Sequence, residues 1–489
     1  MIGGRLGRRL PPLLATALLA LGIYAQICCP QVFSALRHLL FDAYVAAFPA
    51  TVSAPVTVVE IDEQALARHG PWPWPPETLG ALLERLSAAG AVSTGLTMIP
   101  SGGSDQGARS AGDEPPHGAA APPAPLAAGL ASIPGVIGYA LTDEGGGTEL
   151  PPRRAGVVVV GAAAPMLRRR LTGSLLPSAE SIAAAAGLGA LNVFPDPDGR
   201  VRRVPVLVQM DGELFPSLAA EILRVAAGAG SYLVRVAADA GANAPMSVRI
   251  GNRTIPLDEN AEVWLHYAPR AELPVLGAAR VLDGEAPASL LAGRIVLVGV
   301  SAPGIGGRVS SPLGEVLSAA AIHAQALSQL LAGTSPLRPR WAPGAEALVG
   351  ALGSLLLILL SLRVRGVWLV LAGLLLVAAV LAGGFWLFGE RLLLFDAAKP
   401  GLIVVVVFST LALAGYVVSE RERRFVQRAF SSFVSPNLVR YLMQHPETLR
   451  LRGERRECSF IMTDLAGFTS LVERSAPEDL VDLVNDYLD

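Results

Sequence analysis

Four runs of apolar residues interrupt an otherwise mixed pattern of hydrophobic and polar positions. The runs cover 11–29, 344–362, 366–388 and 401–418. Each is close to the roughly 20 residues that a helix needs to cross the hydrocarbon core of a bilayer, so we predict four transmembrane helices. A signal peptide is the alternative for the first run, which follows a basic start. No A-x-A cleavage site follows that run, and we therefore expect a retained membrane anchor.

Clusters of arginine orient these four helices. The clusters stand before the first run, between the second and third, and after the fourth: Arg5, Arg8, Arg9, Arg363, Arg365, Arg421, Arg423, Arg424 and Arg428. Cytoplasmic loops carry an excess of arginine, and four helices place all three clusters on that side. We therefore expect a multi-pass protein of the plasma (inner) membrane, with residues 1–10 and the C-terminus in the cytoplasm. The roughly 310 residues between the first two helices are then extracytoplasmic.

The segment between the first two apolar runs alternates between two periodicities. Short β-branched runs predict strands at Val56–Ile61, Gly90–Met98, Val157–Val160, Val201–Val208 and Arg294–Val300. Helical patterns predict helices at Thr78–Ala89, Ser178–Ala186, Pro216–Ala226 and Ala319–Leu331. This alternation predicts a mixed α/β domain. Residues 101–125 are rich in Gly, Ala, Pro and Ser, which favours a flexible insertion.

Composition narrows the classes of function. Hydrophobic residues make up 52% of the 489 residues and charged residues 16%, whereas soluble domains carry about 25% charged residues. These values exclude a mainly disordered chain and argue against a wholly soluble one. The net charge of −2 provides no basic field, so we expect no nucleic-acid partner. The cysteines, Cys28, Cys29 and Cys458, predict no disulfide framework.

Several polar and aromatic residues of the predicted α/β domain have both a structural and a functional interpretation. Asp62 ends a predicted strand and is suited to cap the next helix. Trp72 and Trp74 stand between prolines and are expected to wedge a rigid turn into the core. The segment 196–199, Asp-Pro-Asp-Gly, predicts a turn, with a cation site as the alternative. His323 lies in an apolar helical pattern, which favours a core residue over a ligand.

Two charged residues precede the fourth apolar run. Asp396 and Lys399 are three positions apart, a spacing at which side chains on a helix pair. We expect an anchor at the outer membrane interface rather than part of an ion pathway.

The α/β domain resembles a known family of sensors. The segments "LLFDAYVAAFP" (39–49), "VTVVEIDEQALARHGPWPWP" (56–75), "GLGALNVFPDPDGRVRRVPV" (187–206), "FPSLAAEIL" (215–223) and "GRIVLVGVSAPGI" (293–305) are similar to CHASE-type extracytoplasmic sensors of the second numbered family. The resemblance covers about residues 36–335 and implies detection of an unknown extracytoplasmic signal. Pro76 stands where that family commonly has a basic residue, and Thr97 and Gly307 stand where it commonly has Asp. These departures put ligand recognition at those positions in doubt.

The last 35 residues, 455–489, show a second pattern. Cys458–Met462 predicts a short strand that ends at Asp464, followed by a turn at Gly467 and a helix. An aspartate after a strand is suited to a hard divalent cation, and amides of Gly467, Phe468 and Thr469 at a helix start are suited to a polyphosphate. A capped helix after a strand is the structural alternative. Beyond it, a capping box at 475–478 precedes an amphipathic stripe of Leu480, Leu483, Val484 and Tyr487.

The end of the chain resembles the start of a class III nucleotidyl cyclase. "SFIMTDLAGFTSL", preceded by "FVSPNLVRYLMQHPETLRLRGERRE", is similar to that catalytic domain and its connector, here residues 419–449. The resemblance implies a ferredoxin-like α/β domain and two ions, Mg²⁺ or Mn²⁺, held by Asp464 and by the backbone carbonyl of Leu465. It also implies that Gly467, Phe468 and Thr469 cradle the triphosphate, with ATP preferred to GTP. The family works as a homodimer, here through the connector and the cyclase domain.

Together the patterns predict a membrane receptor in which an extracytoplasmic sensor controls conversion of ATP to cyclic AMP and pyrophosphate. The other catalytic residues that the resemblance implies do not occur in 455–489, so we expect a fragment of a longer protein that is inactive as it stands. A non-catalytic sensor with a vestigial output is the main alternative. A sensor kinase is disfavoured because His445, before Pro446, lacks a phosphoacceptor context. A transporter is disfavoured because the apolar runs lack paired intramembrane charges.

Overall fold

The structure is a computed structural model that describes residues 2–28, 33–100, 124–161, 167–237, 246–364, 366–431, 457, 459, 461–462, 466–474 and 476–488. It divides into two compact units, residues 1–418 and residues 419–489. The expected insertion, apart from residues 124–125, and the expected connector beyond residue 431 lie outside the described residues.

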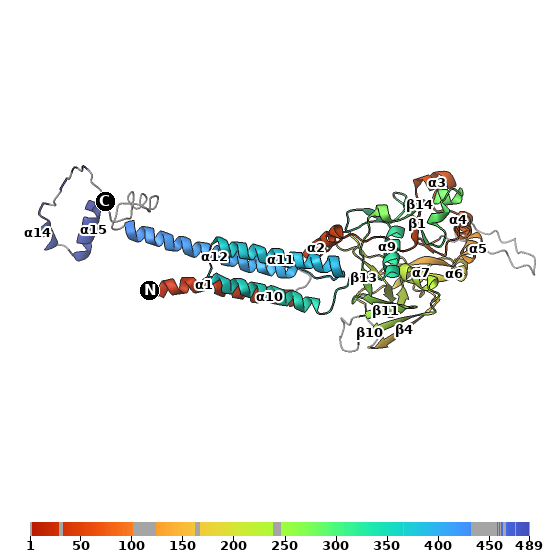
Figure 1. Ribbon diagram of the computed structural model, residues 1–489, viewed down its shortest axis with the longest axis horizontal. Helices are drawn as coiled ribbons and strands as arrows, with labels where there is room; N and C mark the ends of the chain where they lie inside the picture. The colour runs from red at the N-terminus through yellow and green to blue at the C-terminus, as the bar shows by residue number, and fades with distance from the viewer. Residues whose placement is uncertain are drawn as a thin grey trace, which may run out of the picture. The chain divides into compact units, whose positions relative to one another are not determined.

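A parallel sheet forms the centre of the first unit (Figure 1). Its strands lie in the order β14 (Val275–Gly277), β1 (Val56–Ile61), β15 (Ile295–Val300), β2 (Ser93–Leu96), β3 (Gly135–Thr142) and β6 (Gly187–Ala190). Neighbours along this order are parallel, with Val58 opposite Leu297, and β5 (Gly173–Leu175) pairs antiparallel with β3. The strand β15 comes late in the chain but lies between β1 and β2. The C-terminal part of the domain therefore supplies a central strand of the sheet.

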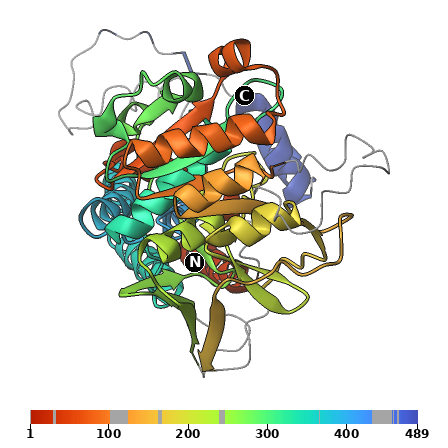
Figure 2. The same ribbon diagram turned by 90° about the vertical axis from the view of Figure 1, so that its right-hand side faces the viewer.

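Helices cover both faces of this sheet because its strands are apolar on both sides. Along β1, Val56 and Val58 face a first hydrophobic core, whereas Val59 and Ile61 face a second core on the other side of the sheet. The second core is covered by α3 (Glu63–His69), α4 (Pro76–Ala88), α5 (Pro125–Ser132), α6 (Ala179–Ala184) and α8 (Ala278–Leu282), with α4 and α5 side by side in orange in Figure 2. The first core is covered by α7 (Leu218–Ala226) and α9 (Ala319–Ala332).

The first core continues into a second, smaller sheet. This sheet has the order β12 (Arg253–Leu257), β11 (Met246–Ile250), β10 (Ser231–Val236) and β4 (Gly156–Gly161). Three two-stranded ribbons complete the domain: β7 (Arg203–Pro205) with β13 (Glu262–Trp264), β8 (Leu207–Met210) with β9 (Glu213–Pro216), and β16 (Arg308–Ser310) with β17 (Val316–Ser318). The predicted mixed α/β domain is therefore confirmed.

Two predicted boundaries in this domain are wrong for local reasons. The run 201–208 was expected to be one strand, but it divides at Val206 into β7 and β8, which pair with different partners. The helix expected from Pro216 begins at Leu218 because Pro216 ends β9. Ser217 is its N-cap, and the Ser217 hydroxyl accepts a hydrogen bond from the amide of Ala220 at 3.4 Å.

Among the residues that the structure describes, three helices are long and apolar enough to cross a membrane, by length and composition. They are α10 (Ala342–Ser361), α11 (Val367–Arg391) and the stretch Ala398–Phe425 of α12 (Ala398–Ser431). The first predicted span falls on α1 (Ile2–Cys28), whose apolar stretch Pro11–Gln26 is shorter than these three. The structure thus supports three of the four predicted spans. The helix α1 nevertheless packs beside α10 and α12, with Ala15 buried and Gly22 against Ile403 (Figure 1).

The second unit contains two short helices, α14 (Phe468–Val472) and α15 (Pro477–Leu488), within its described residues. The predicted turn at Gly467 is confirmed, since this residue is left-handed with φ 82°. The predicted strand at 458–462 is not formed at its described residues, Ser459, Ile461 and Met462. Ile461 and Met462 are 89% and 98% exposed. A strand needs a paired neighbour, and the described part of this unit offers none.

Candidate functional site

The helix α2 (Ser34–Ala47) joins the α/β domain to the membrane helices. It buries one face, which includes Phe41 and Tyr44 at helical spacing. Phe41 packs on Trp264 of β13, with ring centroids 4.7 Å apart. Tyr44 stacks on Phe388 of α11 at 5.4 Å and meets Phe385 edge-on at 4.8 Å. A single short helix therefore contacts both the α/β domain and the apolar helices.

The same helix is tied to the α/β domain by a buried ion network. Arg202 is only 1% exposed. Its Nε and Nη2 donate to the two carboxylate oxygens of Asp42 on α2, at 2.7 and 2.8 Å. Its Nη1 also donates to Asp196 at 2.9 Å and its Nη2 to Asp198 at 2.6 Å. A bidentate arginine–carboxylate pair fixes both distance and orientation, so the position of α2 is coupled to the 196–202 segment.

The predicted turn at 196–199 supplies two of these carboxylates. The Gly199 amide donates to the Asp196 carbonyl at 2.8 Å, which closes the turn. The cation held by this turn is the guanidinium of Arg202 rather than a metal ion. Hydrogen bonds from Arg202 lower the pKa of Asp198 to about 2. Within the described residues, no group of three or more His, Cys, Asp or Glu is placed to hold a metal.

The network continues from Asp196 to a buried glutamate. Arg203 donates to Asp196 at 3.0 Å, and its Nη1 lies 3.4 Å from Oε2 of Glu262 on β13. The Arg203 guanidinium also stacks over the Trp264 ring at 5.2 Å. Burial raises the pKa of Glu262 to about 7, against the attraction of Arg203. A carboxyl group with such a pKa changes charge near neutral pH.

A second charged cluster lies where the apolar helices meet the α/β domain. Lys399 Nζ is 3.7 Å from Asp396 Oδ2, so the predicted pair is confirmed. The pair is buried, and Glu346 of α10 lies beside it, 3.8 Å from Lys399 Nζ. Arg338 completes the cluster, with its Nη1 2.9 Å from Glu346 Oε1. Glu346 was not among the residues predicted from the sequence, although an acidic residue at the fifth position of an apolar helix is a signal that could have identified it.

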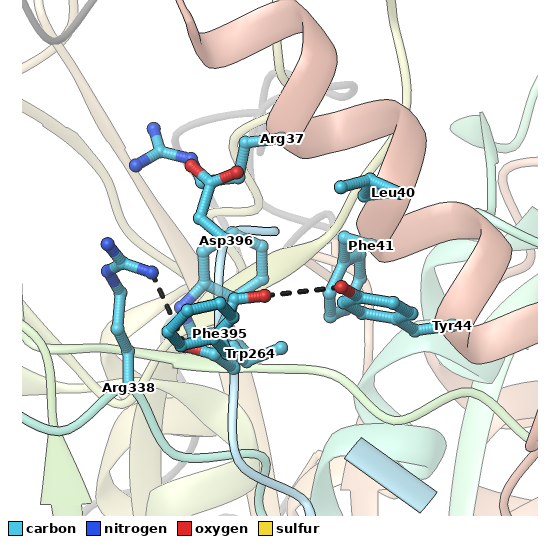
Figure 3. A pocket seen from close by; sticks show the side chains of 9 residues that line it. Arg37, Leu40, Phe41, Tyr44, Trp264, Arg338, Phe395 and Asp396 are labelled. Atoms are coloured by element: carbon cyan, nitrogen blue, oxygen red, sulfur yellow. Dashed lines mark hydrogen bonds between the residues drawn. The ribbon is translucent and has the colours of Figure 1, made fainter. Parts of the chain in front are cut away.

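A pocket opens beside this cluster (Figure 3). It is formed by α2, β13 and the segments just before α10 and α12, and its lining comprises Arg37, Leu40, Phe41, Tyr44, Trp264, Arg338, Leu394, Phe395 and Asp396. The Tyr44 hydroxyl donates to the Phe395 carbonyl at 3.2 Å, and Arg338 Nη1 donates to the Leu394 carbonyl at 3.3 Å. The pocket therefore lies at the junction that α2 makes between the α/β domain and the apolar helices.

The sequence was then compared with known families. The family model described as the CHASE2 domain matches residues 14–361, well over half of the chain. The chain belongs to the CHASE2 domain family. The matched range contains the predicted range 36–335, begins inside α1 and ends at Ser361, the last residue of α10. No curated protein and no solved structure matched the chain in the same comparisons.

The CHASE2 match includes the junction as well as the α/β domain. It covers α2, the Arg202 network, the pocket residues up to Arg338 and the helix that carries Glu346. Together with the three apolar helices, it fits a membrane sensor. The match does not reach residues 455–489, so the expected cyclase site has no support from this comparison.

Two of the three positions that depart from the CHASE2 pattern, Thr97 and Gly307, follow strands at the carboxyl edge of the parallel sheet, as does Asp62. Asp62 follows β1 and caps α3, accepting the Ala65 amide at 2.8 Å, as predicted. Thr97 follows β2 and donates its hydroxyl to the Val298 carbonyl at 3.0 Å. Ligands of parallel α/β sheets bind at this edge, yet here Asp62 and Thr97 satisfy backbone groups and Gly307 offers no side chain.

The other singled-out residues of the CHASE2 domain serve its packing. Trp74 is buried and donates its Nε1 hydrogen to the Gly70 carbonyl at 2.9 Å, which confirms the wedge, and Trp72 packs partly buried beside it. His323 is fully buried in α9, with Nε2 3.4 Å from the Leu191 carbonyl. Burial lowers the pKa of His323 to about 4, so it is a neutral core residue rather than a ligand.

The expected nucleotide site is only partly within the described residues. Asp464 and Leu465, the expected metal ligands, lie outside them. Gly467 precedes α14, and Phe468 and Thr469 form its first turn. These three residues lie at one turn, where the Ser470 hydroxyl donates to the Gly467 carbonyl at 2.8 Å. The triphosphate role remains a prediction.

Proposed function

We propose that this chain is the sensing and membrane part of a receptor that controls a cytoplasmic class III nucleotidyl cyclase. The observation that carries the receptor part is the docking of α2. Asp42 binds the sensor through Arg202, while Tyr44, two residues on, packs against Phe388 of α11. If the segment that carries Arg202 moves and both contacts persist, α2 and α11 move with it.

The long helix α12 supports transmission of this movement. It begins next to the buried cluster at Lys399 and continues without a break to Ser431, over 34 residues. At about 1.5 Å per residue this is about 50 Å, more than the roughly 30 Å hydrocarbon core. A continuous helix carries rotation or translation from one membrane surface to the other.

We also propose that α1 spans the membrane as the fourth helix, which puts both termini in the cytoplasm. The arginine clusters favour this arrangement. The packing of Ala15 and Gly22 against the bundle is consistent with it.

The proposed output rests on the sequence of 455–489. Two ions, Mg²⁺ or Mn²⁺, would be held by Asp464 and the Leu465 carbonyl, and Gly467–Thr469 would hold the triphosphate. The ribose 3′-oxygen of ATP would attack the α-phosphorus in line, forming cyclic AMP and releasing pyrophosphate. The reaction requires a homodimer and further catalytic residues that 455–489 does not supply.

Expression of the complete reading frame tests this proposal. Membranes from cells that lack other cyclases should produce cyclic AMP when supplied with ATP and Mn²⁺ or Mg²⁺. Asp464→Ala should lower the rate at least about 100-fold, since removal of a metal ligand removes stabilisation of the transferring phosphoryl group. The matched control Asp479→Ala changes an exposed acid of α15 and should keep the rate. Wild-type membranes with a folded sensor and no cyclic nucleotide would establish the vestigial output instead.

A further inference from the structure

Arg37 on α2 differs from the other buried or half-buried cations at the junction. Arg338 is paired with Glu346, Lys399 with Asp396, and Arg202 with its carboxylates. Arg37 has neither a hydrogen bond nor an ion pair with any residue that the structure describes, and its Nε is shielded from solvent without a partner. A shielded N–H group without an acceptor is costly, so an anion that accepts from Arg37 Nε would remove this cost.

Charges of both signs surround Arg37. Burial and the nearby charges of Arg338 and Arg203 lower the pKa of Arg37, whereas Asp396 and Glu346 raise it. Arg37 and Arg338 line the same pocket, together with the apolar side chains of Phe41 and Trp264 (Figure 3). Asp396 also lines the pocket, and neither of its carboxylate oxygens has a hydrogen-bond partner among the described residues. Its negative charge is offset by Lys399, 3.7 Å away, and that of Glu346 by Arg338. Among the described residues of this cluster, Arg37 is thus the cation left without an ion pair.

The position of the pocket identifies the source of the anion. It lies at the ends of the membrane helices, between the start of α10 and the start of α12. Beside Arg37 on α2, Leu36 and Leu39 are exposed, Leu39 by 65%. Exposed leucines next to a basic residue on a short helix are typical of segments that rest on a bilayer surface.

We propose that the Arg37 pocket binds the phosphodiester group of a phospholipid from the extracytoplasmic leaflet. A phosphodiester carries one negative charge, which offsets the single unpaired guanidinium. Guanidinium groups bind phosphate oxygens in a planar, bidentate manner, and basic pockets between membrane helices are sites for lipid headgroups. The acyl chains would extend along Leu36 and Leu39. The bound lipid would hold α2 at the membrane surface, whatever output the receptor controls.

Native mass spectrometry of the full chain in detergent tests this site. The probes are dioleoyl phosphatidylglycerol and, separately, inorganic phosphate. We expect one phosphatidylglycerol to bind per chain with high occupancy, and Arg37→Gln to weaken that binding by about tenfold or more, as expected for loss of a charged hydrogen bond. Arg37→Lys keeps the charge and should retain part of the affinity. Arg340→Gln removes an exposed arginine near the start of α10 and should leave the affinity unchanged.

Three results would overturn the proposal. Equal affinity of wild type and Arg37→Gln would show that the lipid binds elsewhere. An equal loss in Arg340→Gln would indicate diffuse attraction to basic residues rather than a site. Binding of inorganic phosphate at Arg37 without binding of the lipid would exclude a headgroup as the occupant. Each variant should match the wild type in its circular dichroism spectrum and unfolding temperature. A loss of lipid binding then reflects loss of the site rather than misfolding.

Discussion

At the scale of single residues, Arg202 is the side chain on which the docking of α2 depends most. Arg202→Met would leave Asp42, Asp196 and Asp198 close together and without their shared cation. Removing one partner of a buried ion pair costs about 3–5 kcal/mol, and we expect a loss of this size in the free energy of unfolding of the purified chain. Arg200→Met is the control, since the Arg200 side chain is 39% exposed and its ion pair among the described residues is with Asp42. Its expected loss is about 1 kcal/mol or less. Equal losses would contradict a special role for Arg202.

Glu262 makes the stability of the sensor depend on pH. Its pKa rises from an ordinary 4.5 to about 7 on folding because burial disfavours the charged form. The contribution of Glu262 to stability is therefore full below pH 4.5 and is lost as the pH rises through about 7. The change is at most about 3 kcal/mol. Glu262→Gln remains uncharged and should remove this loss. The unfolding temperature of the variant should therefore exceed that of the wild type at pH 8 and equal it at pH 4.5.

The neighbouring acid provides the control for this pH profile. Glu259 lies on the same turn and pairs with Arg168 at 2.6 Å, partly exposed. Glu259→Gln should keep the pH profile of the wild type. If Glu262→Gln and wild type lose stability in parallel between pH 5 and pH 8, another group is responsible for the slope.

Residues whose partners are local were predictable from the sequence, and residues with distant partners were not. Asp62 caps a helix through an amide three residues ahead, so the pattern alone indicates its role. Asp42 and Arg202 are 160 residues apart, and Glu346 meets Lys399 across two helices. Periodicity carries no information on such pairs, because they are set by the strand order and by the crossing of helices.

At the scale of elements, a pair of glycines on α11 tests the contact between α2 and the membrane bundle. A Cβ on Gly384 would lie 2.3 Å from the Tyr44 hydroxyl and 2.9 Å from the Cβ of Ala397, whereas a Cβ on Gly383 would meet nothing within 4 Å. Gly384→Ala should therefore push α2 away from α11, at a cost of about 1–3 kcal/mol in unfolding free energy. Gly383→Ala should be neutral or slightly stabilising.

A second substitution separates this clash from a general effect of alanine. Tyr44→Phe removes the hydroxyl that the new Cβ would meet, along with its hydrogen bond to the Phe395 carbonyl. The double variant Gly384→Ala with Tyr44→Phe should lose less stability than the two single losses added together. Strict additivity would show that α2 and α11 do not press on each other at this point.

Elements were predictable where a short run of residues determines its own conformation. The strand 56–61 has the predicted bounds, because its β-branched residues are bordered by Pro55 and the capping Asp62. The ribbon strands β7 and β8 could not be separated from sequence, since a change of pairing partner at Val206 leaves no mark on the hydrophobic pattern. The strand expected at 458–462 had the right residue types, but pairing rather than propensity decides a strand.

At the scale of the whole molecule, the α/β architecture followed from the alternation of elements, but the connection of sensor to membrane did not. That connection is made by α2, a helix of 14 residues that no periodicity distinguishes as a linker. It brings a buried ion network and an aromatic cluster together within three positions, Asp42 to Tyr44. The predicted orientation of the chain in the membrane concerns the two parts that this helix joins, the α/β domain and the membrane helices.

That orientation can be measured by labelling cysteines from outside the cell. In a chain whose native cysteines are replaced by serine, Glu144→Cys lies on an exposed loop of the sensor and Arg363→Cys on the exposed turn between α10 and α11. A membrane-impermeant maleimide should label position 144 in intact spheroplasts and position 363 only after lysis, because arginine-rich turns stay in the cytoplasm. Labelling of both from outside, or the reverse order, would invalidate the orientation.

The same assay decides the course of α1. A helix of 27 residues is about 40 Å long at about 1.5 Å per residue, so α1 is long enough for the roughly 30 Å core even though its described apolar stretch is short. Gly4→Cys should then be protected in spheroplasts, as position 363 is, and react after lysis. Labelling of position 4 from outside would place α1 on the sensor side, and α2 would then receive movement from the sensor and pass it to α11 alone.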